Sequence, residues 1–132
     1  MDFSIPLQPI TRPQVNFLAY RGKPVLLFYF GPTCPHCQAA TPEIQTFAGE
    51  IRAKGVETLA IANMRSDFQE IGEFITKYGV KIPVYWDTVR KFGETYQVTS
   101  LPTLFLVGKN GEVYRLENYS GHASLDSLRA RI

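Results

Sequence analysis

The sequence predicts an α/β fold in which helices cover both faces of a mixed β-sheet. Segments with strand-like and helix-like periodicity follow one another in the order β, β, α, β, α, β, α, β, β, α. Strands that alternate with helices form parallel pairs joined by crossovers, whereas strands joined by a short turn are antiparallel. With 132 residues, 45% of them hydrophobic, and no internal repeat, we expect one domain over 1–132.

The first half of the chain carries the longest apolar run. An irregular, proline-rich arm over 1–13 and a first short strand at about 15–19 precede an apolar strand over 25–30. A helix then begins at the cysteines and runs to about Lys54, with apolar residues at helical spacing. It contains Pro42, which we expect to kink it.

The second half alternates strands and helices and ends with a hairpin. The next elements are a buried strand, an amphipathic helix opened by a capping-box pattern at Ser66 to Gln69, a short strand and a short helix, over 56–62, 66–79, 82–86 and 88–96. Asn110-Gly111 is the strongest hairpin signal, and it predicts a two-residue turn between strands over 103–108 and 112–117. A last helix begins at about Ser124.

The two cysteines of the chain stand in the motif Cys34-Pro35-His36-Cys37, between the apolar strand and the helix that follows it. If Cys34 is the N-cap, Pro35 occupies the first helical position, where its missing N–H costs nothing. The helix N-terminus then favours the Cys34 thiolate, and a positively charged His36 would favour it further. Side chains three residues apart on a helix are close enough for a disulfide, so we expect Cys34 to be the nucleophile and Cys37 the resolving thiol.

Two other interpretations of the cysteine pair are less favourable. A structural zinc site needs four ligands, and the only other histidine is His122, so we predict no metal ligands. A permanent structural disulfide would close a very short loop and remove little entropy from the unfolded chain. A redox-active Cys34–Cys37 disulfide without a further cofactor is therefore the favoured interpretation.

Charge and hydropathy exclude some classes of partner. The formal net charge is +2, with 14 basic and 12 acidic residues interspersed, so nucleic acid is not an expected partner. The longest apolar run is the six residues over 25–30, far short of a membrane span. We expect a monomer. A Cys-x-x-Cys pair works in reducing and oxidising compartments alike, which leaves a cytoplasmic location open.

The chain resembles thioredoxin-fold proteins in three features. These are the Cys34 to Cys37 motif after a buried strand, Pro42 five residues beyond the second cysteine, and Leu101-Pro102-Thr103 before a strand and a hairpin. An additional strand–helix unit between Cys37 and Pro102 is similar to the TlpA/ResA/CcmG-like group of extracytoplasmic thiol-disulfide oxidoreductases. The resemblance implies a periplasmic or membrane-anchored protein, with any signal or anchor outside the given sequence.

The resemblance also implies partners and further site residues. Partners would be proteins with thiols or disulfides, including apocytochrome c, and a membrane or soluble protein that recharges the pair. Pro102 is expected to be cis and to face the sulfurs, and the backbone of Leu101 to pair with an extended substrate. Thr33, where the group usually has tryptophan, is expected to contact substrate.

Other departures from the group concern proton transfer. Phe28 stands where these proteins usually place a polar or acidic residue, and Ala40 where ResA-like members carry glutamate. The usual buried proton acceptor for Cys37 is therefore missing. The Pro35-His36 dipeptide matches strongly oxidising relatives, so we expect a potential less reducing than that of ordinary thioredoxins. A disulfide-forming oxidase or isomerase, and a Cu(I)- or haem-pathway thiol-binding protein, stay open as alternatives.

Overall fold

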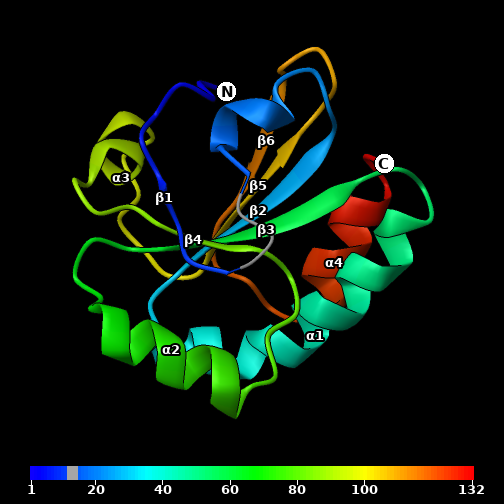
Figure 1. Cartoon of the computed structure of the whole chain (residues 1–132). Coiled ribbons are helices and arrows are strands. Elements are labelled where there is room, and N and C mark those ends of the chain that lie inside the picture. Colours follow the sequence, from blue (N-terminus) through cyan, green and yellow to red (C-terminus); the bar gives the residue numbers. More distant parts are fainter. Residues whose placement is uncertain (12–14) are drawn as a thin grey trace.

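A six-stranded mixed sheet forms the centre of the computed structural model, which describes residues 1–11 and 15–132 (Figure 1). The strands lie in the order β1-β4-β3-β2-β5-β6. Their bounds are Gln8–Pro9, Val25–Phe30, Glu57–Ala62, Val84–Trp86, Thr103–Val107 and Val113–Leu116 for β1 to β6. Strands β2, β3 and β4 are parallel, whereas β1, β5 and β6 pair with their neighbours in antiparallel fashion. The predicted mixed sheet is confirmed.

Strand β2 occupies an interior position of the sheet because every one of its residues is apolar or aromatic. All six are buried, which is typical of a strand covered on both faces. It pairs with β3 in parallel and with β5 in antiparallel fashion, so that Phe28 lies opposite Ala60 and Leu104. Successive side chains of a strand point to opposite faces, so β2 contributes to two separate cores.

The helices divide unequally between the two faces (Figure 1). One face is covered by α1, α2 and α4, and the other by the 3₁₀ helix η1, by α3 and by the N-terminal arm. The bounds of η1 and of α1 to α4 are Phe17–Tyr20, Pro35–Arg52, Phe68–Lys77, Lys91–Thr95 and His122–Arg129. Helix α1 continues through Pro42.

The N-terminal region differs from the prediction. The strand expected at 15–19 is wrong, because Phe17–Tyr20 forms a 3₁₀ helix whose first turn is capped by the Asn16 side chain. The part of the arm expected to be irregular contains strand β1 over Gln8–Pro9, which pairs with the edge strand β4. The end of the arm, residues 12–13, lies outside the described residues.

The start of α2 lies one residue later than predicted. Asp67, not Ser66, is the N-cap: its side chain accepts from the Glu70 N–H at 2.7 Å, and the Glu70 side chain accepts from the Asp67 N–H at 3.2 Å. Ser66 instead donates to the Asn63 side chain at 2.6 Å. With this start, Phe68 lies at the first helical position and is 63% exposed, so the buried face of α2 consists of Ile71 and Phe74 and does not include Phe68.

The β5–β6 hairpin also differs in its turn. The Gly111 N–H donates to the Gly108 carbonyl and the Gly108 N–H to the Glu112 carbonyl, both at 2.9 Å, which encloses a three-residue loop. Gly111 has φ +88°, whereas Asn110 is not in the left-handed region that a two-residue type I′ turn requires. The hairpin is confirmed, and the two-residue turn is wrong.

Candidate active site

Cys34 is the N-cap of α1, as the sequence predicts. Its backbone is extended, with φ −80° and ψ 118°, and Pro35 begins the helix. The Cys34 Sγ accepts a hydrogen bond from the Cys37 N–H at 3.4 Å. A helix N-terminus that donates to sulfur stabilises a thiolate relative to a thiol. The partly exposed Cys34 is therefore the sulfur positioned to react with another molecule.

Cys37 lies one helical turn further on and is completely buried. Its sulfur accepts a hydrogen bond from the Gly31 N–H at 3.5 Å. Both cysteines are free thiols in this structure. An accessible Cys34 in front of a shielded Cys37 is the arrangement that an attacking and a resolving thiol require.

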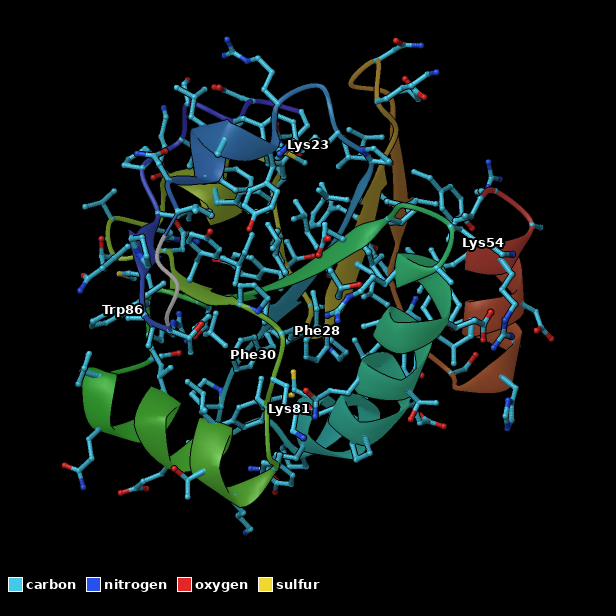
Figure 2. The ribbon with its side chains drawn as sticks, turned by 45° about the vertical axis from the view of Figure 1, so that its right-hand side comes forward. Lys23, Phe28, Phe30, Lys54, Lys81 and Trp86 are labelled. Carbon is cyan, nitrogen blue, oxygen red and sulfur yellow. The ribbon has the colours of Figure 1, made fainter. Side chains whose placement is uncertain are left out.

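The surroundings of Cys37 are almost entirely hydrocarbon. Phe28 and Phe30 of β2 and Ala40 of α1 belong to the same buried cluster as Cys37. The rings of Phe28 and Phe30 are stacked, with centroids 5.5 Å apart and planes 7° from parallel. Figure 2 shows both phenylalanines between the sheet and the helices. Phe28 and Ala40, where the resemblance led us to expect a polar or acidic residue and a glutamate, thus belong to an apolar environment around Cys37.

This environment determines the acid–base behaviour of Cys37. Burial raises the pKa of the Cys37 thiol well above its ordinary value, and the neighbouring Cys34 raises it further. The Gly31 N–H lowers the pKa by a smaller amount. Among the described residues no carboxylate contributes to the shift, so the structure shows no acidic proton acceptor for Cys37.

The Leu101–Pro102 peptide bond is cis, as predicted. The Cys34 thiol donates to the Leu101 carbonyl at 3.8 Å, so the loop lies against the reactive sulfur. The Thr103 hydroxyl donates to the Ser100 carbonyl at 2.7 Å and fixes the loop. Among the described residues the Leu101 N–H has no hydrogen-bond acceptor, which leaves it available to an extended peptide.

The other predicted site residues are at the surface of the same region. Thr33, Pro35 and His36 are exposed on the two sides of Cys34. No hydrogen bond joins the His36 side chain to a described residue; it lines a concavity of about 250 Å³ together with Pro102 and Tyr119. Its predicted influence on the thiolate therefore has to act through space.

A buried carboxylate is present, but on the opposite face of the sheet. Asp87 follows β4 directly, is fully buried, and accepts from the Tyr29 hydroxyl at 2.7 Å and from the Phe92 and Gly93 N–H groups at 3.1 and 2.9 Å. Burial and this hydrogen bond raise the pKa of Tyr29 well above its ordinary value. Sequence reasoning missed this network; an acidic residue directly after the short buried strand was the available signal.

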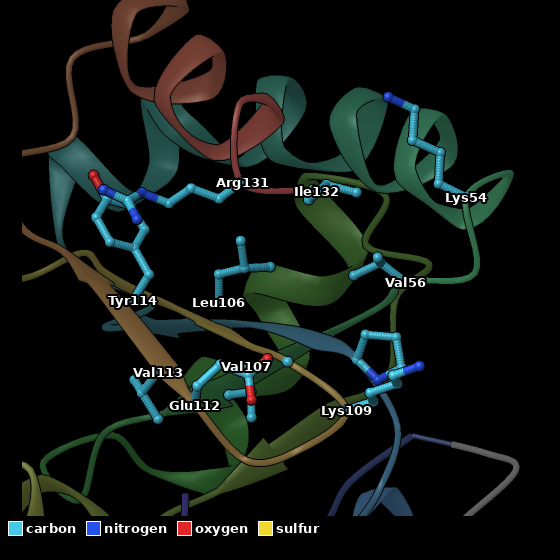
Figure 3. A pocket seen from close by; sticks show the side chains of 12 residues that line it. Lys54, Val56, Leu106, Val107, Lys109, Glu112, Val113, Tyr114, Arg131 and Ile132 are labelled. Carbon is cyan, nitrogen blue, oxygen red and sulfur yellow. The ribbon is translucent and has the colours of Figure 1, made fainter.

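A separate concavity of about 610 Å³ lies at the far end of α1 (Figure 3). It is lined by Lys54, by Leu106 and Tyr114 of the hairpin strands, and by Arg131 after α4. None of the predicted site residues lines it, so it is not part of the cysteine site.

Residues 1–11 and 15–132 contain no cluster of three or more histidine, cysteine or acidic side chains that could hold a metal ion. Within the same residues no helix is both long and apolar enough to cross a membrane.

The sequence of this chain matches a known protein family and is similar to known proteins. A model of the Redoxin family matches residues 3–130. Thiol-disulfide oxidoreductase ResA of Bacillus thuringiensis (strain Al Hakam) is 36% identical over 108 residues, which are 82% of this chain and 61% of that protein. ResA of Bacillus subtilis (strain 168) is 32% identical over 110 residues, or 83% of this chain and 61% of that protein. The chain thus spans about three fifths of the length of these relatives.

Solved structures give the same fold. A putative thiol:disulfide interchange protein DsbE from Chlorobium tepidum superposes with a TM-score of 0.81 at 20% identity, covering 96% of this chain and 91% of that one. A secreted Mycobacterium tuberculosis disulfide oxidoreductase homologous to E. coli DsbE gives 0.78 at 23% identity, covering 95% and 91%. The predicted thioredoxin-like fold and the resemblance to the TlpA/ResA/CcmG-like group are confirmed.

Proposed function

Because the chain belongs to the Redoxin family, we propose that it is a thiol-disulfide oxidoreductase that exchanges its Cys34–Cys37 pair with cysteines of partner proteins. The observation that carries this proposal is the difference in exposure between the two sulfurs. Cys34 is partly exposed and receives a helix N–H, whereas Cys37 is buried one turn behind it. The ResA relatives bear the same activity in their name.

In the reducing direction the Cys34 thiolate attacks a substrate disulfide. One substrate thiolate leaves, and the other substrate sulfur stays bonded to Cys34. Cys37 then loses its proton and attacks the Cys34 sulfur, which releases the second substrate thiolate and closes the Cys34–Cys37 disulfide. Two electrons pass to the substrate. The oxidising direction reverses these steps.

Deprotonation of Cys37 is the step that this site assists least. Burial holds its pKa high, and the described residues offer no carboxylate beside it. We propose that the substrate thiolate released in the first step accepts this proton, because that step generates a base at the site. The Gly31 N–H, which donates to the Cys37 sulfur, stabilises the thiolate as it forms.

The assignment of the two cysteines is tested by single substitutions. Cys34→Ser should lose at least about 10³-fold of the rate of insulin disulfide reduction, because the attacking sulfur is gone. Cys37→Ser should instead accumulate a covalent adduct between Cys34 and substrate, detected by mass spectrometry before and after reductant. Adducts that accumulate on Cys34→Ser would reverse the assignment.

The location, the substrates and the redox partner of the protein are a second part of this proposal. We propose that the protein acts in the cell envelope, on cysteines of apocytochrome c or similar substrates, and that a membrane or soluble redox protein recharges it. The ResA relatives and the secreted fold neighbour support this location. Capture of envelope proteins as disulfide adducts of the Cys37→Ser protein tests the substrate class. Adducts confined to cytoplasmic proteins would contradict it.

A further inference from the structure

We propose that the concavity beside Leu101 is a subsite for an acidic side chain of the substrate polypeptide, bound by Arg65 and Arg90 next to the reacting cysteine. This inference rests on the proposed function. The concavity measures about 350 Å³ and lies between the loop after β3, the start of α3 and the segment before Pro102. None of the residues predicted from sequence to bind substrate, except Leu101, lines it.

The concavity lies next to the reactive sulfur of Cys34. Leu101 lines it, and the Leu101 carbonyl lies 3.8 Å from the Cys34 Sγ. A Cβ on Gly31 would lie 3.1 Å from Leu101 Cδ1, 3.6 Å from Asn63 Nδ2 and 3.7 Å from Cys34 Cβ, so these groups converge around one residue. An extended peptide advances about 3.3 Å per residue, so the acidic residue should lie within a few residues of the substrate cysteine.

The lining of the concavity favours an anion. Its charged groups are Arg65 and Arg90, and its other polar side chains include Asn63, Thr99 and Ser100. No carboxylate lines it, and neither arginine forms an ion pair with a described residue. A guanidinium donates two parallel N–H bonds to a carboxylate, which makes arginine the preferred partner of acidic side chains.

The backbone holds Arg90 in an unusual position. Its φ of 61° and ψ of 15° lie in the left-handed region, which residues other than glycine seldom adopt. The Arg90 N–H donates to the Asp87 carbonyl at 3.1 Å, and the Arg90 carbonyl accepts from the Glu94 N–H at 2.9 Å. Such strain persists where the surroundings enforce it, and it is concentrated at functional sites.

The stem of the Arg90 side chain lies beside the buried Asp87 network. The Asp87 carboxylate binds the Phe92 and Gly93 N–H groups and the Tyr29 hydroxyl. The Arg90 Cγ lies 3.7 Å from where a Cβ on Gly93 would be, so the Arg90 stem lies across this glycine. Asp87 is already bound to three donors and fully buried, which leaves the Arg90 guanidinium available to a ligand.

A set of matched peptides tests this proposal. Each peptide carries one cysteine, activated as a mixed disulfide with neutral 2-thiopyridine, and a neighbouring Glu, Gln or Lys at the same position. Cys34 of the reduced protein attacks the peptide sulfur and releases 2-thiopyridone, which is measured by absorbance. Cys37 then attacks Cys34 and releases the peptide thiol. The Glu peptide should react about five- to tenfold faster than the Gln peptide, and the Lys peptide more slowly than both.

Two double variants distinguish binding by Arg65 and Arg90 from a general effect of the protein's positive charge. R65Q/R90Q should lose the preference for Glu and keep the rate with the Gln peptide. R52Q/K54Q removes the same charge at the far end of α1, roughly 25 Å from the cysteines, and should keep the preference. Circular dichroism and thermal unfolding check that both variants are folded.

The outcomes distinguish this proposal from the proposed function. Equal rates for the Glu and Gln peptides, or an equal loss of preference in both double variants, would overturn the acidic subsite while leaving the exchange activity in place. Failure to release 2-thiopyridone from any peptide would overturn the exchange activity and the subsite together. Arg90→Lys should keep only part of the preference, because lysine retains the charge without the two-pronged geometry.

Discussion

The two faces of strand β2 carry opposite kinds of chemistry, although they are built by adjacent residues. Phe28 points to the face of α1 and lies in the same apolar cluster as Cys37. Tyr29 points to the face of α3 and binds the buried carboxylate of Asp87. Asp87 is the only buried acidic residue among residues 1–11 and 15–132, and it lies on the face of the sheet opposite Cys37.

A buried carboxylate in a thiol-disulfide oxidoreductase need not take part in proton transfer at the cysteines. Asp87 is separated from Cys37 by the sheet, and its contacts are with Tyr29 and the start of α3. Its role in this structure is to fix the loop that carries Arg90. Cys37, in turn, has its pKa set by burial. Substitutions in the Asp87 network and substitutions around Cys37 should therefore differ in how much they change stability and how much they change the chemistry of the thiol.

The largest expected effect follows from Asp87→Ala. This change leaves two buried N–H groups and the Tyr29 hydroxyl without their acceptor, and it should lower the free energy of unfolding by about 3–5 kcal/mol. Phe28→Leu on the other face should cost only about 1 kcal/mol, because it removes a little packing. Urea unfolding measures both. A loss under about 1 kcal/mol for Asp87→Ala would show that the network does not hold the α3 region.

A smaller effect is expected at Gly93. A Cβ there would lie 2.9 Å from the Tyr29 hydroxyl oxygen, so Gly93→Ala should cost about 1–3 kcal/mol. Combining it with Tyr29→Phe should recover part of that cost, because the oxygen is removed. Gly72→Ala on exposed α2, where nothing lies within 4 Å, is the matched control and should be neutral or slightly stabilising. Strictly additive losses in the Tyr29–Gly93 pair would contradict this contact.

The smallest effect is expected at His36. It is exposed, and no described group binds its side chain, so any effect on the Cys34 sulfur has to act through space. His36→Gln should make the disulfide more reducing by at most about 30 mV, which is a tenfold change in the exchange equilibrium. Equilibration with a glutathione buffer, followed by quantifying the closed pair, measures this difference. A wild-type potential equal to the roughly −270 mV of thioredoxin would contradict the tuning role.

The parts of this molecule that follow from local chemistry were predictable. Apolar residues 25–30 gave the buried strand, and Cys34 with Pro35 gave the start of α1. Phe28 and Ala40 pointed to an apolar environment for Cys37, because the residue types at these two positions decide it. The three-residue hairpin loop was not predictable from Asn110-Gly111, since both loop lengths accept this dipeptide.

The parts that depend on distant contacts were not predictable. Asp87 is recognisable as functional only when Tyr29 and the α3 start are brought to it by the fold. The left-handed conformation of Arg90 has no sequence signal, because arginine is not a residue that favours it. The concavity between Arg65 and Leu101 joins segments that are far apart in the chain.

The raised pKa of the buried Cys37 thiol also makes stability depend on pH. The reduced folded protein keeps the Cys37 proton, whereas an unfolded thiol loses it near pH 8.5, so the contribution of Cys37 is complete below about pH 8.5. Above that pH the free energy of unfolding should fall by up to about 1.4 kcal/mol per pH unit. Cys37→Ala should lack this part of the slope. An identical slope in wild type and variant would show that Cys37 does not titrate on unfolding.

The most direct test of the claim that burial is the main cause of the raised Cys37 pKa is the titration of Cys37 itself. The ¹³Cβ chemical shift of Cys37 in the reduced protein, followed by NMR from about pH 6 to about pH 10, reports whether the thiol ionises around the ordinary value of about 8.5. We predict that Cys37 stays protonated across this range and that Asp87→Asn leaves its titration unchanged. A Cys37 midpoint at or below about pH 8.5, or one that moves in Asp87→Asn, would contradict the account.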